Sequence, residues 1–200
     1  MAMRGSLFVI SGPSGVGKNT IIQEVMRRDQ SLALMITATT RAPRPGESHA
    51  RDYFFLTPDE FIHRIQAGGF AEWAVVHGHH YGTPRDELLQ LLDSGRDVLL
   101  QVDVQGARRL MSAPDLEVIS IFLMPPSVEA LEERLRGRGT DSREVINERL
   151  ANARNEMSAR DDYDYVVVNT SISEAAESIL RIIDRERQRA AVDQTASLDV

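Results

Sequence analysis

The chain has 200 residues, contains no cysteine and carries a formal net charge of −7 at pH 7. Its length and ordinary apolar content predict one globular domain, and the lack of cysteine excludes a disulfide scaffold and a thiolate metal site. The acidic balance argues against nucleic acid or an anionic membrane as a partner, and no apolar stretch is long enough to span a bilayer. Met1 to Gly5 lead straight into the first predicted strand and leave no room for a signal peptide, so we expect a cytoplasmic protein.

The first motif lies between a buried strand and an amphipathic helix. Residues 6–11 form a short apolar run typical of a strand, and the apolar spacing from Ile21 to Met26 predicts one face of a helix. Between them residues 12–18 read Gly-Pro-Ser-Gly-Val-Gly-Lys, and a glycine loop in this setting cradles phosphates with its backbone N–H groups. Lys18 is the only lysine of the chain, so an ammonium is kept where a phosphate loop needs one. A glycine-rich turn without a ligand is the alternative.

The later elements alternate between strand and helix. Thr57, Pro58 and Glu60 predict a helix that begins with a capping box. Other strands are predicted at 98–102, 118–123 and 165–168, with helices at about 128–135, 142–160 and 175–189. This alternation predicts an α/β fold with a mainly parallel central sheet flanked by helices. The predicted parts are a core (1–34, 96–126 and 161–189), an inserted lobe (35–95), a short lid region (127–160) and a frayed tail (190–200).

The inserted lobe carries side chains suited to a second, phosphorylated substrate. Arg41 and Arg44 flank a rigid turn and can fork onto one phosphate, although two solvent-exposed loop arginines are the alternative. Tyr53 and Tyr81 add hydroxyl groups in the same lobe. These residues predict a clamp for a phosphate group.

A carboxylate in the lobe indicates which base the substrate carries. Glu72 lies in an apolar stretch, where a carboxylate should have a partner. A carboxylate accepts from both N1–H and the 2-amino group of guanine, and adenine lacks these donors, so Glu72 favours guanine. The histidines of the lobe suggest a metal site as an alternative, but no cysteine accompanies them, and Tyr81 and Thr83 already explain that loop. Those histidines are His77, His79 and His80.

An arginine-rich segment predicts a moving lid. Gly137 and Gly139 interrupt helical order around Arg138, which suits a segment that closes over a substrate. Phosphoryl transfer needs charge stabilisation and alignment more than covalent chemistry, and arginines supply both. The alternative is a solvated basic face paired to Glu132 and Glu133.

Taken together, these motifs resemble the guanylate kinase family, whose members phosphorylate GMP with ATP. The resemblance extends from about Ser6 to about Arg187. It rests on the loop at 12–18 and on the segments 39–47, 52–55, 72–74, 81–83, 103–106 and 134–140. The resemblance implies a P-loop kinase that transfers the γ-phosphate of ATP to GMP or dGMP, with Mg²⁺ accompanying ATP; it leaves the oligomeric state open.

The resemblance also implies roles for particular residues. It implies that the catalytic residues are Lys18, Arg134, Arg138 and Arg149. It implies that ATP is bound by Gly12, Pro13, Ser14, Gly15, Val16, Gly17, Lys18, Asn19, Thr20 and Asn169. It implies that GMP is bound by Thr37, Arg41, Arg44, Tyr53, Glu72, Tyr81, Thr83 and Asp103. No residue is assigned directly to the metal, but Asn19, Thr20 and Asp103 are candidates for contact through its water shell.

Two positions depart from the family pattern. Asn19 stands where a hydroxyl residue usually follows the lysine, and Gln101 stands where an acidic residue is usual. Nucleotide phosphates and water often hold most of the magnesium shell, so we expect activity to survive with an altered metal dependence.

Two other functions compete with the kinase reading. One is a guanylate-kinase-like module that binds a protein partner and has lost turnover; Lys18 and the arginine set argue against it. The other is a related kinase with a non-nucleotide acceptor, which Glu72 and the phosphate clamp disfavour.

Overall fold

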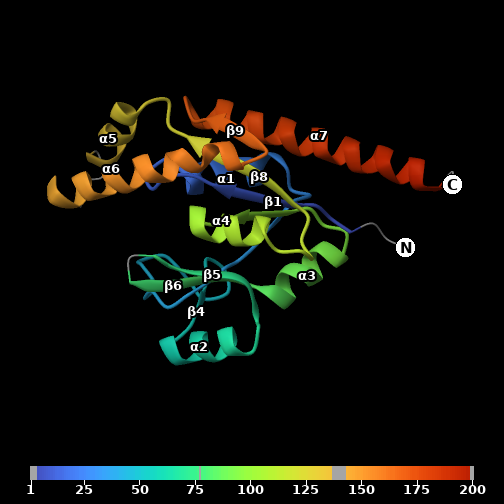
Figure 1. Cartoon of the computed structure of the whole chain (residues 1–200), viewed down its shortest axis with the longest axis horizontal. Helices are drawn as coiled ribbons and strands as arrows, with labels where there is room; N and C mark the ends of the chain where they lie inside the picture. The colour runs from blue at the N-terminus through green and yellow to red at the C-terminus, as the bar shows by residue number, and fades with distance from the viewer. Residues whose placement is uncertain (1–3, 77, 137–142, 199–200) are drawn as a thin grey trace. The chain divides into compact units, whose positions relative to one another are not determined.

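The computed structural model describes residues 4–76, 78–136 and 143–198. The chain forms two compact units, one from Met1–Val9 and Ser31–Ile119, the other from Ile10–Gln30 and Ser120–Val200. Figure 1 shows both units, with labels on the helices and on several of the strands. Residues 96–119 therefore group with the predicted lobe, and the boundaries of core, lobe and lid stay predictions about function.

The first unit contains a four-stranded sheet in the order β4-β3-β6-β5. Its strands have between two and seven residues. They are β3 (Ala38–Thr39), β4 (Phe54–Phe55), β5 (Phe70–Val76) and β6 (His79–Pro84). Strands β5 and β6 are antiparallel, and their register places Glu72 directly opposite Thr83. A pair of residues opposite each other on one face of a sheet interacts directly, so this register builds part of the site.

The described residues of the first unit form three helices: α2 (Pro58–Gln66), α3 (Arg85–Asp93) and α4 (Val104–Met111). The predicted capping box at α2 is confirmed, because Thr57 Oγ1 accepts from Glu60 N at 3.3 Å and Glu60 Oε2 accepts from Thr57 N at 2.7 Å. Phe61 of α2 stacks on Phe70 with ring centroids 4.4 Å apart, which fixes the helix on the sheet. Helices α3 and α4 both pack against β5.

The larger sheet is mainly parallel, as predicted, with the strand order β2-β7-β1-β8-β9. In the first unit β2 (Ala33–Leu34) pairs in parallel with β7 (Val98–Gln101). In the second unit β8 (Val118–Met124) pairs in parallel with β9 (Tyr165–Val168). Strand β1 (Leu7–Ser11) is buried along its whole length, which matches its apolar sequence.

The second unit holds the remaining helices. Helix α1 (Lys18–Arg28) packs along α7 (Ile172–Leu198). Helix α5 (Val128–Arg136) packs on α6 (Arg143–Met157), and a short 3₁₀-helix, η1 (Ser158–Asp162), follows. The α5–α6 contact is an apolar cluster of Leu131, Leu135, Ile146, Leu150 and Ala153. The predicted helix at 142–160 is therefore an α-helix that ends at Met157 and tightens into a 3₁₀ turn.

The end of the last helix corrects the sequence prediction. Helix α7 continues to Leu198, whereas the apolar pattern predicted an end near Arg189 and a tail beyond it. No glycine or proline interrupts residues 190–198, and alanine and glutamine in this segment favour helix, so the helix has no reason to stop at Arg189. Within the described parts of the chain, none of the helices has the length and apolarity that crossing a membrane requires.

Candidate functional site

The phosphate loop of the second unit has the backbone that its glycines predict. Gly15 and Gly17 have φ angles of 87° and 97°, in the left-handed region that favours glycine. Helix α1 begins immediately after this turn, so its N-terminal N–H groups open toward the loop. The Lys18 ammonium folds back over the loop and donates to the carbonyls of Gly12 at 2.5 Å and Pro13 at 3.1 Å.

Arg134 and Asn169 come together at the same loop. The Arg134 guanidinium donates to the carbonyl oxygens of Val16 at 3.2 Å and Asn169 at 2.9 Å. The Asn169 amide also donates to Val16 O at 2.7 Å, and its own Oδ1 is buried without a hydrogen-bond partner among the described residues. These contacts place two residues that are far from the loop in sequence directly on its backbone.

A cavity of about 420 Å³ adjoins this loop. Its walls come from three segments of the second unit: the loop with α1, helix α5, and the start of α7. The lining residues are Gly15, Gly17, Thr20, Arg134, Asn169, Thr170, Ser171 and Ile172. Four residues that the resemblance assigns to ATP, together with the predicted catalytic Arg134, thus line one space.

The other predicted residues of this unit lie on α1, on α6 or outside the described residues. Asn19 and Thr20 are exposed in the first turn of α1, and Arg149 is half-buried on α6. Arg138 lies outside the described residues. The roles assigned to these four residues stay predictions.

One contact of the loop was not predicted. The backbone N–H of Ser14 donates to Glu156 Oε2 at 3.1 Å, and Glu156 lies near the end of α6. The two residues are separated by 142 positions in the chain, so no local pattern could have paired them. Glu156 holds one edge of the loop.

In the first unit, Glu72 is a buried carboxylate with a partner, as its apolar surroundings predict. Thr83 Oγ1 donates to Glu72 Oε1 at 2.7 Å, and the exposed fractions are 6% for Glu72 and 0% for Thr83. Burial raises the pKa of Glu72 to about 7. The Thr83 hydrogen bond lowers the pKa, nearby Asp103 raises it, and Arg109 lowers it.

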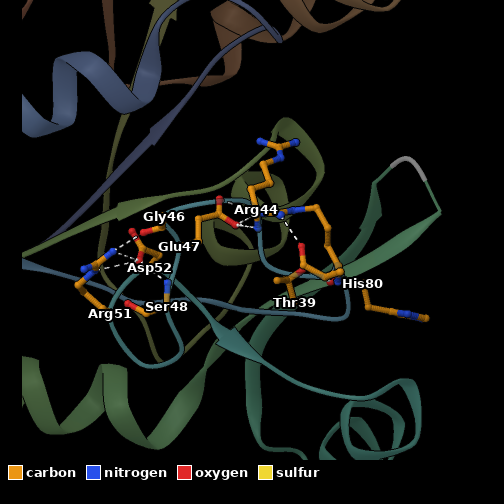
Figure 2. Close-up of polar contacts among 10 residues, drawn as sticks. Thr39, Arg44, Gly46, Glu47, Ser48, Arg51, Asp52 and His80 are labelled. Atoms are coloured by element: carbon orange, nitrogen blue, oxygen red, sulfur yellow. Dashed lines mark hydrogen bonds and ion pairs between the residues drawn. The ribbon is translucent and has the colours of Figure 1, made fainter. Parts of the chain in front are cut away.

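The predicted phosphate clamp is held by an acidic residue that was not assigned a role. Arg41 NH2 donates to both carboxylate oxygens of Glu47 at 3.0 Å, and the backbone N–H of Arg44 donates to Glu47 Oε2 at 2.7 Å. Figure 2 shows Glu47 next to Arg44 in this turn, with Arg51 and Asp52 close by. An acidic residue at the end of an arginine-bearing turn was the available signal for this role.

Aromatic rings complete the clamp. The Arg41 guanidinium carbon lies 5.5 Å from the centroid of the Tyr53 ring, and the rings of Tyr53 and Tyr81 meet edge to face at 6.2 Å. Burial alone would lower the pKa of Arg41, but hydrogen bonds to Glu47 and Tyr81 outweigh this effect and raise the pKa. The guanidinium therefore stays protonated. Burial raises the pKa of Tyr53, so its hydroxyl keeps its proton. The structure thus brings together Arg41, Tyr53 and Tyr81, while the Arg44 side chain is exposed.

Asp103, Thr37 and Gln101 lie at the ends of helices and strands of the first unit. Asp103 is the N-cap of α4, and its Oδ1 accepts from Gly106 N at 2.8 Å. Thr37 lies half-buried beside β3, and its carbonyl accepts from Phe54 N at 2.9 Å. Gln101 ends β7 and is half-buried.

The metal site suggested by the histidines finds no support among the residues that the structure describes, because no group of three histidine or acidic side chains there could hold a metal ion. The ring of His80 packs on the ring of Phe61, with the two centroids 5.2 Å apart.

A mainly parallel α/β sheet, a glycine loop that opens a helix, and a separate arginine–tyrosine clamp define the class of P-loop nucleotide kinases. The sequence profile described as Guanylate kinase matches residues 4–186, and the chain belongs to the guanylate kinase family.

Individual relatives agree with this family. The chain is 47% identical over 184 residues to a guanylate kinase of Sphingopyxis alaskensis, covering 92% of this chain and 84% of that protein. It is 48% identical over 188 residues to a guanylate kinase of Xylella fastidiosa, covering 94% of this chain and 91% of that protein. The crystal structure of guanylate kinase from Anaplasma phagocytophilum is similar with a TM-score of 0.76 and 36% identity, covering 92% of this chain and 87% of that one.

Proposed function

We propose that this chain transfers the γ-phosphate of ATP to GMP, giving ADP and GDP, and that dGMP is also an acceptor. Membership of the guanylate kinase family supports the reaction. The buried Glu72–Thr83 pair is the observation that carries the choice of base. An ionised carboxylate is an acceptor only, so it suits the two adjacent donors of guanine and leaves adenine without a matching partner.

ATP is assigned to the second unit. Backbone N–H groups of the loop and the Lys18 ammonium are suited to its phosphates, because a compact cation on a flexible stem can follow a moving phosphoryl group. The cavity lined by Asn169, Thr170 and Ser171 is proposed for the adenine, because it adjoins the phosphate loop and the family resemblance assigns Asn169 to ATP. Arg134, Arg138 and Arg149 are proposed to stabilise the charge of the transferring phosphoryl group.

GMP is assigned to the first unit. Arg41, Arg44, Tyr53 and Tyr81 hold its phosphate, with Glu47 fixing the first arginine and the backbone of the second. Thr37, Glu72, Thr83 and Asp103 face the guanine. A GMP phosphate oxygen attacks the γ-phosphorus of ATP, the bond from that phosphorus to the bridging oxygen breaks, and ADP leaves with the electron pair. Alignment and charge stabilisation are sufficient for this step, and no side chain needs to form a covalent bond.

Nucleotide kinases generally need a divalent metal, and we propose Mg²⁺. The residues present fit a water-mediated contact, because the exposed Asn19 and Thr20 at the start of α1 both carry oxygen acceptors for a hard cation. Bound with ATP, the ion neutralises phosphate charge. If Asn19 weakens its outer shell, Asn19→Ser should lower the free Mg²⁺ needed for half the maximal rate; identical Mg²⁺ curves for the two proteins would discard that role.

The test of the function is a coupled assay of ADP formation with GMP, dGMP, AMP and CMP as acceptors in parallel. We expect turnover with GMP and dGMP and very little with AMP or CMP. Binding of GMP without ADP formation would indicate a binding module instead of an enzyme. Equal rates with GMP and AMP would remove the base-reading role of Glu72.

A further inference from the structure

Helix α4 contains a glycine that its backbone does not require. Gly106 lies within α4, which spans Val104–Met111, and it is buried. Glycine in the body of a helix is less favourable than alanine, because it loses more backbone freedom on folding. A reason for the glycine must therefore come from its surroundings.

The surroundings leave no space for a side chain. A Cβ on Gly106 would lie 2.7 Å from Glu72 Oε2 and 3.2 Å from Glu72 Cδ. It would also lie 3.2 Å from Asp103 Oδ1, the oxygen that caps α4. A separation of 2.7 Å is below van der Waals contact, so one of the two groups would have to move.

The group that would move is the Glu72 carboxylate. The Gly106 backbone is fixed by its place in α4 and by the bond from its N–H to Asp103, whereas the carboxylate is the free end of a side chain. Glu72 is nonetheless confined, because Thr83 holds its other oxygen and the residue is buried. Displacement would therefore break the Thr83 contact or rotate the carboxylate away from its present position.

We propose that Gly106 is a positioning residue that sets where the Glu72 carboxylate presents its oxygens, and thereby sets selectivity for guanine over adenine. This inference rests on the proposed function, in which Glu72 reads the base. Gly106 touches neither substrate in this account and acts only through Glu72.

The proposal predicts a small effect on folding and a large one on recognition. Gly106→Ala places a better helix former inside α4, which offsets part of the cost of displacing the carboxylate, so the melting temperature should change by no more than about 5 °C. The KM for GMP should rise about ten- to a hundredfold, because a buried polar contact to the base is lost or distorted. The KM for ATP and the activity with AMP should change less than twofold. Gln105→Ala is the matched control, since Gln105 is the adjacent, exposed residue of the same helix, and it should change none of these quantities.

The same substitution made in the Glu72→Ala variant distinguishes an action of Gly106 through Glu72 from a general loss of structure. In Glu72→Ala the clashing carboxylate is gone, so adding Gly106→Ala should leave the KM for GMP unchanged within twofold. A further rise in that background would mean that Gly106 acts by another route, such as the Asp103 cap. A lowered melting temperature with equal losses for GMP and ATP would likewise overturn the proposal. Absence of GMP turnover in the wild type would instead reject the proposed function, so the two failures are distinguishable.

Discussion

Burial gives the Glu72 carboxylate two opposite consequences. It would strengthen the proposed contact to a base, because a low-dielectric surrounding increases the energy of a charged hydrogen bond. It also penalises the ionised form, which is why the pKa of Glu72 is raised to about 7. If Glu72 binds the base as proposed, its burial lowers the stability of the folded chain at neutral pH and strengthens recognition.

The first prediction concerns stability against pH. The pKa of Glu72 is raised from 4.5 to about 7 in the folded state, so the folded chain binds this proton more tightly than the unfolded chain does. The contribution of Glu72 to stability is therefore fully present below about pH 4.5 and is lost as the pH rises through 7, by up to roughly 3 kcal/mol for a shift of this size. Glu72→Gln removes the ionisation, so it should raise the free energy of unfolding at pH 8 clearly more than at pH 5.

Urea unfolding at both pH values measures this effect. Glu174→Gln is the control, because hydrogen bonds from Thr170 and Ser171 lower the pKa of exposed Glu174, and its replacement should not stabilise the protein at pH 8. A Glu72→Gln effect of equal size at pH 5 and pH 8 would show that its ionisation carries no cost.

The second prediction uses the single lysine of the chain. An amine-acylating reagent should modify only Lys18 and the N-terminal amine. ATP should protect Lys18, because its ammonium lies over the loop, within 2.5 Å of Gly12 O, where phosphates are proposed to bind. Peptide mapping with and without ATP measures the protection, with GMP alone as the control that should protect less. Labelling that is indifferent to ATP would contradict the loop's assignment.

At the scale of elements, the turn that bears the clamp arginines is held by one carboxylate. Glu47 accepts three hydrogen bonds from Arg41 and Arg44. Burial alone would raise the pKa of Glu47, but these hydrogen bonds and the charges of the two arginines outweigh it, so the pKa is lowered. Such a turn presents the Arg41 guanidinium already ordered, which reduces the entropy lost when a phosphate binds.

The third prediction tests this order. Glu47→Gln keeps the shape but removes the charge and one strong acceptor, so the KM for GMP should rise about three- to tenfold while the KM for ATP stays constant. Asp52→Asn is the control, because Asp52 accepts from Ser48 and Arg51 in the same turn and makes no hydrogen bond to Arg41 or Arg44. Equal changes in both KM values would assign Glu47 to general stability.

The elements also show what the sequence could and could not predict. The phosphate loop and the capping box of α2 were predictable, because all of their signals lie within a few neighbouring residues. Helices α3 and α4 were not predicted: α3 begins at Arg85, directly after Pro84, which provides no side-chain cap, and α4 carries Gly106 in its first turn. Both helices pack against β5, and this tertiary contact adds to weak local signals such as the Asp103 cap of α4.

Within the site, contacts between residues that are distant along the chain could not be predicted from the sequence. Glu72 was predicted to have a partner from its apolar neighbours, but Thr83 is identified only by the register of β5 and β6. The contact of Ser14 with Glu156 and the crowding of Gly106 against Glu72 exist only after folding. A pattern of residue types carries no record of such contacts.

At the scale of the whole molecule, the two compact units offer a way to assign each substrate by binding alone. A ligand that binds only the native state stabilises it by about 2.7 kcal/mol at a hundred times its Kd, and for a chain of this size that corresponds to a rise in melting temperature of about 5–10 °C. We expect GMP and ATP, each added alone with Mg²⁺, to raise the melting temperature.

Lys18→Ala should abolish the rise in melting temperature given by ATP and keep that given by GMP, because the phosphate loop belongs to the second unit. Glu72→Ala should do the reverse, because Glu72 belongs to the first. Each variant is thus the control for the other. Loss of both shifts in either variant, measured by thermal unfolding at saturating nucleotide, would contradict the assignment of ATP and GMP to separate units.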